Sequence, residues 1–194
     1  MREKITGVIL AGGLGRRMGG IDKGLQELRG QTLVSRVVER LAPQVDELLI
    51  NANQNAARYA AFGYRVVADQ IPDFAGPLAG LQAALSSARH PLLATAPCDS
   101  PFLPSDLVSR LLAALRTANA DLAVARTFAQ AHPVFCLCRR EVLPHLTAFL
   151  ASGGRKFEDW YATLNSVEVA FDDEAEAFEN INTREELSRF DSAP

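Results

Sequence analysis

Glycines and cations gather in one short stretch near the start of the chain, directly after an apolar run. The run covers residues 5–11, and the stretch after it holds glycines at 12, 13, 15, 19 and 20 beside Arg16, Arg17 and Lys23. Glycine lets backbone N–H groups approach an anion closely, and successive N–H groups in such a turn form a concave phosphate site, to which fixed cations add charge. The stretch therefore predicts a strand that ends in a triphosphate-binding loop. The simpler alternative is an ordinary glycine-rich turn between a strand and a helix.

Two common phosphate-binding loops do not fit this stretch. The dinucleotide fingerprint needs a third glycine where this chain has Met18, and an acidic residue where the predicted second strand ends in Asn51. The Walker loop needs Gly-Lys-Ser/Thr, whereas Lys23 lies between Asp22 and Gly24. The predicted loop therefore belongs to neither class.

Three motifs in the stretch resemble those of nucleotidyltransferases, which move a nucleoside monophosphate onto a phosphorylated acceptor. They are Leu10-Ala-Gly-Gly13, Arg17-Met-Gly-Gly20 and Asp22-Lys-Gly24, and within that class they look like the molybdenum cofactor guanylyltransferases. The resemblance covers the chain from Ile5 to Leu187. It implies Mg²⁺ as cofactor, catalytic roles for Arg17, Lys23 and Asp99, and nucleotide contacts from Leu10, Ala11, Gly12, Gly13 and Lys23.

Composition and charge set limits that agree with a nucleotide-binding enzyme. A chain of 194 residues with 48% apolar content is long enough for one α/β domain with a sizeable core. The net charge of −3 and a pI of about 5.6 argue against a general nucleic-acid binder. The sequence holds no run of 18 apolar residues and no signal-peptide pattern, so we expect a cytoplasmic protein with no membrane contact.

The three cysteines do not suggest a disulfide framework or a zinc site, because they form no Cys-x-x-Cys pair. Cys136 and Cys138 alternate along an apolar run and should share one face of a strand, whereas Cys98 precedes Asp99. We interpret all three as small buried hydrophobic residues rather than as a catalytic thiol.

Apolar runs that fit strands alternate with patterns that fit helices. Strands are expected at 5–11, 45–51, 64–68, 91–97, 120–126, 133–139 and 166–171, and helices near 32–42, 54–62, 77–88, 104–118, 141–151, 155–163 and 183–190. This alternation predicts a single-domain, three-layer α/β/α fold with a mostly parallel sheet, similar to the Rossmann-like nucleotidyltransferase fold. Ligands of such sheets bind beyond the carboxyl ends of the strands, and that rule selects the residues to consider next.

Asp99 directly follows the predicted strand 91–97. Its hard carboxylate oxygens suit Mg²⁺, which takes only one or two protein carboxylates together with substrate phosphates. The alternative is a turn, because Asp-Ser-Pro is good turn chemistry. Pro97-Cys-Asp-Ser-Pro101 resembles the segment that carries the magnesium aspartate in the family, so Asp99 is expected to bind both the metal and the nucleotide.

Asn51 and Asp69 end the second and third predicted strands, on the same edge as Asp99. Their amide and carboxylate groups suit a guanine edge or ribose hydroxyls, although both residues also form turns readily. Both match nucleotide-binding positions of the family. Gly76-Pro-Leu-Ala-Gly80 accompanies Leu-Ala-Gly-Gly in the guanine-using members, so Gly76 and Gly80 are expected nucleotide contacts and GTP is expected over CTP.

Residues of the C-terminal part are expected to bind the acceptor. Asn180 and Asn182 would project to one face if the chain is extended there, although Thr183-Arg-Glu-Glu186 also forms a capping-box pattern. His132-Pro133 resembles a pair in molybdopterin-modifying enzymes. Arg155 and Lys156 follow a glycine turn at a predicted helix start, where cations oppose the helix dipole, and this favours an anion site. Trp160 and Tyr161 are expected to pack in the core.

The resemblance implies transfer of GMP from GTP to the terminal phosphate of molybdopterin, with release of pyrophosphate. We expect one domain over 1–194, with a nucleotide-binding half at about 1–103 and an acceptor-binding half at about 104–194. The implied partners are the two substrates and, transiently, cofactor-biosynthesis proteins and acceptor molybdoenzymes. The alternatives are a related cytidylyl or sugar-phosphate nucleotidyltransferase and a non-catalytic protein that binds GTP or the cofactor.

Overall fold

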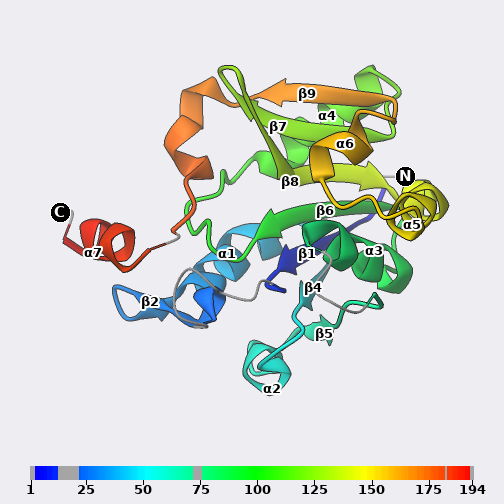
Figure 1. The fold of residues 1–194 in the computed structure, drawn as a ribbon. Coiled ribbons are helices and arrows are strands. Elements are labelled where there is room, and N and C mark those ends of the chain that lie inside the picture. Colours follow the sequence, from blue (N-terminus) through cyan, green and yellow to red (C-terminus); the bar gives the residue numbers. More distant parts are fainter. Residues whose placement is uncertain (1–2, 13–21, 72–75, 182, 193–194) are drawn as a thin grey trace.

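The computed structural model describes residues 3–12, 22–71, 76–181 and 183–192. Its centre is a seven-stranded sheet with the order β5-β4-β1-β6-β8-β7-β9 (Figure 1). The strands are β1 (Ile5–Leu10), β4 (Glu47–Asn51), β5 (Arg65–Val67), β6 (Leu92–Pro97), β7 (Leu122–Thr127), β8 (Gln130–Arg139) and β9 (Ser166–Ala170). β8 is antiparallel to both of its neighbours and every other pair is parallel, which confirms the predicted mostly parallel sheet.

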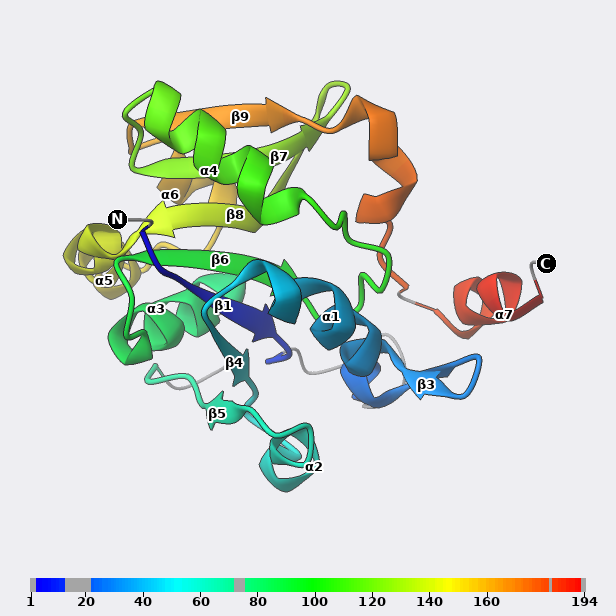
Figure 2. The ribbon, with the colours of Figure 1, turned by 180° about the vertical axis from the view of Figure 1, so that it is seen from behind.

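Helices cover both faces of the sheet and complete the three predicted layers. One face carries α1 (Leu33–Leu41) and α4 (Leu107–Thr117), as Figure 2 shows; the other carries α3 (Pro77–Ser87), α5 (Leu143–Ala151) and α6 (Phe157–Tyr161). Successive residues of β1 point to opposite faces, so Ile5 and Ile9 join the core beneath α1 and α4, and Val8 and Leu10 join the core beneath α3 and α5. Both faces of β1 are buried, as expected for a central parallel strand.

The pairing register brings the ends of three strands together at one edge. Leu10, the last residue of β1, lies opposite Asn51 of β4 and Pro97 of β6. The segments that follow these three residues therefore leave the sheet side by side. This edge holds the site described below.

The β7–β8 hairpin differs from the sequence-based expectation. A strand over 133–139 was predicted, with His132 before it. In the structure β8 begins at Gln130, so His132 lies inside the strand and the predicted boundary was wrong. The register shifts between Val124 and Ala125, which pair with Cys136 and His132, and this irregularity accommodates Pro133.

Smaller elements lie outside the main sheet. A two-stranded hairpin of β2 (Glu27–Leu28) and β3 (Gln31–Thr32) was not predicted, nor was the 3-10 segment η5 (Asp172–Phe178). The helix α7 (Arg184–Ser192) packs near β2, away from the sheet (Figure 1), through a small apolar cluster. The cluster contains Leu28, Leu33, Ile181, Phe102, Leu187 and Phe190. The predicted capping box is confirmed, because Thr183 and Glu186 exchange two hydrogen bonds of 3.1 Å.

Other sequence-based expectations also hold. Cys98, Cys136 and Cys138 are free and buried, and the last two share one core face of the sheet. Trp160 is fully buried, and Tyr161 packs against the same core. Within the residues that the structure describes, no helix is long and apolar enough to cross a membrane.

Candidate active site

The end of β1 is tied to both neighbouring strands. The backbone N–H of Ala11 donates to the carbonyl of Asn51 at 2.8 Å, and the N–H of Cys98 donates to the carbonyl of Leu10 at 3.1 Å. These bonds extend the sheet and fix the first part of the predicted phosphate loop, Leu10 to Gly12. The rest of that loop, including Gly13 and Arg17, lies outside the described residues.

Lys23 and Asp99 meet at this edge. The Lys23 Nζ lies 3.4 Å from the Asp99 Oδ2, and the two side chains are 22% and 14% exposed. Burial raises the pKa of the Asp99 carboxyl, and the nearby Lys23 ammonium lowers it only in part. The structure thus brings together two predicted catalytic residues that are 76 positions apart. The ammonium does not fully offset the effect of burial on the carboxylate.

The C-terminal segment reaches the same loop. The N–H of Ile181 donates to the carbonyl of Asp99 at 2.8 Å, and the Ser100 hydroxyl donates to the Asn180 side-chain oxygen. Asn180, a predicted acceptor residue, is therefore fixed beside the predicted metal ligand. Asn182 lies outside the described residues.

Two asparagines hold Asp69 at the neighbouring part of the edge. The Asn51 Nδ2 donates to Asp69 Oδ1 and the Asn53 Nδ2 donates to Asp69 Oδ2, both at 2.8 Å. The Asn53 Oδ1 accepts from the Asp69 backbone N–H, also at 2.8 Å. Asn51 is 1% exposed and also donates to the carbonyl of Val67. The NH2 group of its side chain is therefore used in hydrogen bonds within the protein. The arrangement makes Asn51 a support for Asp69.

The two predicted glycines of the α3 start have different structural roles. Gly76 precedes the helix with φ of 81°, which only glycine adopts without strain. A Cβ at Gly80 would overlap the Asn51 side-chain oxygen and lie 2.9 Å from its Cγ. Gly80 therefore lets α3 pack directly on Asn51. A larger residue at position 80 would disturb the contact between Asn51 and Asp69.

The remaining predicted acceptor residues make their contacts with other parts of the protein. The His132 ring bonds the Thr127 hydroxyl at 2.7 Å and stacks on Phe178 at 4.9 Å, and burial lowers its pKa. The Arg155 guanidinium donates to the carbonyl of Leu150, near the end of α5, at 2.9 Å. A cation is favourable there, so the dipole argument for an anion site does not hold for Arg155. Lys156 is exposed at the start of α6.

The donor groups at this edge fit Mg²⁺ rather than a metal held by protein alone. Among the described ranges, no group of three or more His, Cys, Asp or Glu side chains could hold a metal ion. One buried carboxylate with hard oxygens and incomplete charge compensation is what Mg²⁺ needs when substrate phosphates supply other ligands. Asp99 meets that requirement. The adjacent Cys98 is no nucleophile, because burial raises the pKa of its thiol well above the usual range.

Sequence reasoning did not assign a role to four residues that organise this edge: Asn53, Asp22, Tyr59 and Asn55. Asn53 bonds Asp69 twice, as described above. Asp22 accepts from the Tyr59 hydroxyl at 2.5 Å and from the Asn55 Nδ2 at 2.9 Å. An asparagine two residues after Asn51 was a visible signal, but the Asp22–Tyr59 contact joins residues 37 positions apart and no local pattern announces it.

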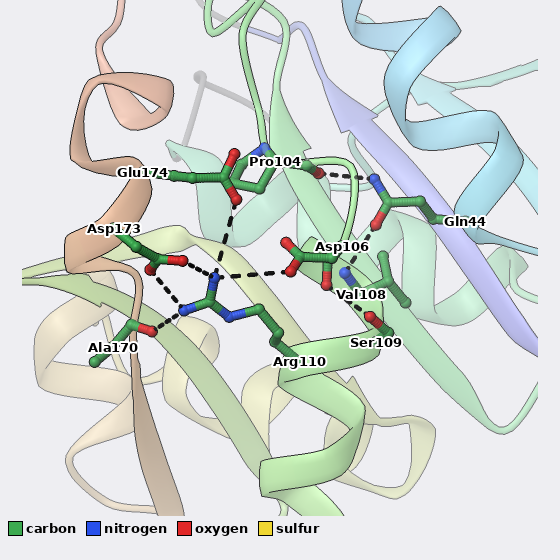
Figure 3. A network of polar contacts seen from close by, with 9 residues as sticks. All are labelled: Gln44, Pro104, Asp106, Val108, Ser109, Arg110, Ala170, Asp173 and Glu174. Carbon is green, nitrogen blue, oxygen red and sulfur yellow. Dashed lines mark hydrogen bonds and ion pairs between the residues drawn. The ribbon is translucent and has the colours of Figure 1, made fainter.

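A second cation–carboxylate group lies elsewhere, between α4 and the η5 segment (Figure 3). The Arg110 guanidinium makes two bonds of 3.0 Å to the Asp173 carboxylate and lies 3.9 Å from the Phe171 ring centroid. Asp106 and Glu174 lie within 3.9 Å of it as well. These bonds lower the pKa of the exposed Asp173 carboxyl and raise that of Arg110. No predicted site residue belongs to this group.

The comparison with known proteins identifies the class. Residues 7–167 match the family model of the MobA-like NTP transferase domain, and the chain belongs to this family of nucleotidyltransferases. One relative, from Cupriavidus necator, is 53% identical over 191 residues, which are 96% of each chain, and is named molybdenum cofactor guanylyltransferase. The resemblance stated from the motifs is therefore confirmed.

Solved structures share the fold. Molybdopterin-guanine dinucleotide biosynthesis protein A from Archaeoglobus fulgidus has a TM-score of 0.78 at 24% identity, over 96% of each chain. 4-Diphosphocytidyl-2C-methyl-D-erythritol synthase from Anaerococcus prevotii has a TM-score of 0.75 at 13% identity, over 98% of this chain and 95% of that one. Proteins named for guanine and for cytidine chemistry thus share one fold.

Proposed function

We propose that this protein transfers GMP from GTP to the terminal phosphate of molybdopterin, forming the molybdopterin guanine dinucleotide cofactor and releasing pyrophosphate. The near full-length similarity to relatives named for this activity supports the pair of substrates. The observation that carries the chemistry is the Lys23–Asp99 pair at the carboxyl edge of β1 and β6, because it joins a cation and a buried carboxylate where nucleotide phosphates would bind.

The reaction needs no general base. An oxygen of the acceptor phosphate monoester, already ionised near neutral pH, attacks the α-phosphorus of GTP. The new O–P bond forms as the bond from the α-phosphorus to the oxygen that bridges to the β-phosphorus breaks, and that electron pair leaves with pyrophosphate. Negative charge grows on the leaving group, so catalysis rests on positioning and on electrostatic stabilisation.

In this proposal the protein supplies fixed positive charge and hydrogen-bond donors. Lys23 neutralises phosphate oxygens, Arg17 adds a second cation, and the backbone of Gly12 and Gly13 approaches the triphosphate. Asp99 would hold Mg²⁺, which when bound offsets the negative charge on the phosphates. The raised pKa of Asp99 supports this role, since a cation bound there relieves the cost of the buried charge.

Asp69 is the nucleotide-binding group that we propose for the base or ribose. Its two oxygens are oriented by Asn51 and Asn53. The absence of a Cβ at Gly80 leaves the space that the Asn51 side chain occupies. This division assigns Asp69 to the ligand and Asn51 to support. From the sequence alone, both residues were expected to contact the nucleotide.

We assign the acceptor to the C-terminal part, with the nucleotide half at about 1–103 and the acceptor half at about 104–194, the boundaries expected from the sequence. The contact of Asn180 with Ser100 supports an acceptor phosphate close to Asp99. His132 is kept oriented by Thr127 and Phe178, and the exposed cations Arg155 and Lys156 complete the proposed acceptor set with Asn182. We place the reaction in the cytoplasm, with transient contacts to cofactor-biosynthesis proteins and to acceptor molybdoenzymes.

The proposal is tested by pyrophosphate release in the presence of Mg²⁺, with GTP, CTP, ATP or UTP and with or without molybdopterin. Release that requires both GTP and molybdopterin is the expected result. A preference for CTP would assign the protein to cytidylyl transfer. Tight binding of GTP without release under any condition would identify a binding protein and contradict the proposal.

A further inference from the structure

Lys23 is carried by a short turn. The 3-10 turn η2 (Lys23–Leu25) contains three residues, and Gln26 N–H donates to the Lys23 carbonyl at 3.0 Å. Leu25 N–H donates to the Asp22 carbonyl at 3.3 Å. A single turn of this kind does not by itself fix the direction of a long lysine side chain.

A contact from the segment that follows β4 restrains this turn. The Tyr59 hydroxyl donates to Asp22 Oδ1 at 2.5 Å, and the Asn55 amide donates to Asp22 Oδ2 at 2.9 Å. Both oxygens of the carboxylate are thus bound by groups from one short segment. Hydrogen bonds to a carboxylate are among the stronger ones in proteins, so this contact restrains the residue before Lys23.

The helix that supplies Tyr59 is built around that one side chain. α2 (Ala56–Ala60) has five residues, and Tyr59 is its only buried one, with 0% exposure. Its ring packs in the core beneath α1 and α4. Burial raises the pKa of the Tyr59 phenol, so the hydroxyl stays protonated and donates its proton to Asp22.

The same hydroxyl explains the glycine after Lys23. A Cβ at Gly24 would lie 2.6 Å from the Tyr59 Oη and 3.2 Å from the Cys98 Cβ. Asp22 and Gly24 therefore both rest against Tyr59, one through a hydrogen bond and the other through close packing. Lys23 lies between these two fixed residues, and its ammonium lies beside Asp99.

We propose that Tyr59 is a positioning residue of the transfer reaction: its hydrogen bond to Asp22 and its packing on Gly24 hold the turn that places the Lys23 ammonium beside Asp99. The inference rests on the proposed function, because Lys23 is taken there to act on the phosphates. Tyr59 acts through Asp22 and Gly24, the two residues that flank Lys23.

The test compares Tyr59→Phe with wild-type enzyme in pyrophosphate release, with kcat and KM for GTP measured separately. The variant keeps the buried ring and loses only the hydroxyl. We expect kcat to fall about 10- to 100-fold through misplacement of Lys23. The KM for GTP should change by less than about threefold, because the Asn51–Asn53–Asp69 group that binds the nucleoside is untouched. Tyr64→Phe, a half-buried tyrosine near β5, is the matched control and should keep wild-type kinetics.

Two further variants separate positioning from a loss of folding. Asp22→Asn weakens the same contact from the other side and should lower kcat in the same way. In a Lys23→Ala background, Tyr59→Phe should cause no further loss of kcat, because its effect passes through Lys23. A general loss of stability would instead add to the effect of Lys23→Ala, and that result would overturn the proposal.

The same experiment distinguishes this inference from the proposed function. If wild-type protein releases pyrophosphate from GTP and Tyr59→Phe has wild-type kcat, positioning by Tyr59 is refuted and the function stands. If wild-type protein releases no pyrophosphate from any nucleotide, the proposed function fails, and the inference about Tyr59 fails with it.

Discussion

Two groups of ionised side chains in this molecule show opposite electrostatics. Lys23 and Asp99 are mostly buried at the carboxyl edge of the sheet, and the pKa of Asp99 is raised. Arg110 lies among three carboxylates near the surface, with two good bonds to Asp173, and the pKa of Asp173 is lowered. In the first group, burial disfavours the charged carboxylate by more than the Lys23 ammonium offsets. In the second, the Asp173 carboxylate is exposed and Arg110 bonds both of its oxygens.

This difference distinguishes a proposed catalytic site from a structural ion pair. A satisfied ion pair such as Arg110–Asp173 holds α4 against the η5 segment and needs nothing else (Figure 3). A buried carboxylate with incomplete compensation costs stability in the free protein and gains favourable interactions when cations or phosphates bind. The carboxylates of these two groups are therefore better distinguished by their burial and by the direction of their pKa shift than by their number.

The largest expected effect comes from removing the mostly buried carboxylate of Asp99. Asp99→Ala should lower the rate of pyrophosphate release at least about 10²- to 10³-fold, the usual cost of one preorganised electrostatic contact, with the fold retained. Lys23→Ala should behave alike. The matched control is Asp173→Ala, which removes a carboxylate from the Arg110 group and should leave the rate unchanged. Equal losses in Asp99→Ala and Asp173→Ala would remove the distinction between the two groups.

A smaller effect should follow from loosening Asp69. Asn53→Ala removes two hydrogen bonds of 2.8 Å, one that Asn53 donates to the Asp69 carboxylate and one that it accepts from the Asp69 backbone N–H. We expect the KM for GTP to rise about tenfold with little change in kcat, because a bond to a charged group contributes about 1.5–3 kcal/mol. The exposed neighbour offers the control Gln54→Ala, measured by the same steady-state kinetics. An unchanged KM in Asn53→Ala would remove Asp69 from the proposed nucleotide site.

Sequence patterns predicted most of the sheet and the edge where the site lies. The apolar run of β1 and the aspartate after β6 are local signals, and the rule for parallel sheets brings them together. Asn51 was expected to face the nucleotide, yet its amide bonds Asp69 and Val67, because two strand ends approach each other there. A sequence gives the residue types at an edge, but not which of them bind one another.

Long-range contacts and short elements explain the rest of what was missed. A helix near 54–62 was expected and α2 lies there, but no local pattern predicts that its Tyr59 reaches Asp22 across 37 positions. The β2–β3 hairpin has two residues in each strand and carries no alternation to detect. Pro133 was taken as a strand boundary, although an irregularity in the β7–β8 ladder lets the strand continue through it.

A structural substitution should sharpen the role given to Gly80. Gly80→Ala places a Cβ where the Asn51 side chain lies, so either α3 or Asn51 must move. Overpacking of this kind costs about 1–3 kcal/mol, measured as the free energy of unfolding in urea. The variant should also raise the KM for GTP, because Asn51 supports Asp69. Ser86→Ala, an exposed position of the same helix, is the control. A fully stable Gly80→Ala with wild-type KM would show that Asn51 has room that the structure does not give it.

The smallest effect is expected at the Arg110–Asp173 ion pair, and this effect on the Tm should depend on pH. Arg110→Gln should lower the Tm by a few degrees near neutral pH and leave pyrophosphate release unchanged. The folded-state pKa of Asp173 is lowered from 3.8, so the stabilisation by Arg110 is full above that pH and is lost as the pH falls through the folded value. The Tm difference from wild type should therefore shrink below about pH 4. A difference that persists in acid would assign the effect to packing on Phe171.

The most direct test of the contrast between the two groups is the thermal unfolding of Asp99→Asn beside wild type, without metal or nucleotide, from pH 7 to pH 3. The folded-state pKa of Asp99 is raised, so its ionisation opposes folding at neutral pH, and that cost disappears when the carboxyl is protonated in both states. The account predicts that Asp99→Asn is at least as stable as wild type at pH 7 and that any advantage vanishes in acid. A variant that is clearly less stable than wild type at pH 7, as Arg110→Gln should be, would contradict it and make Lys23–Asp99 a structural ion pair.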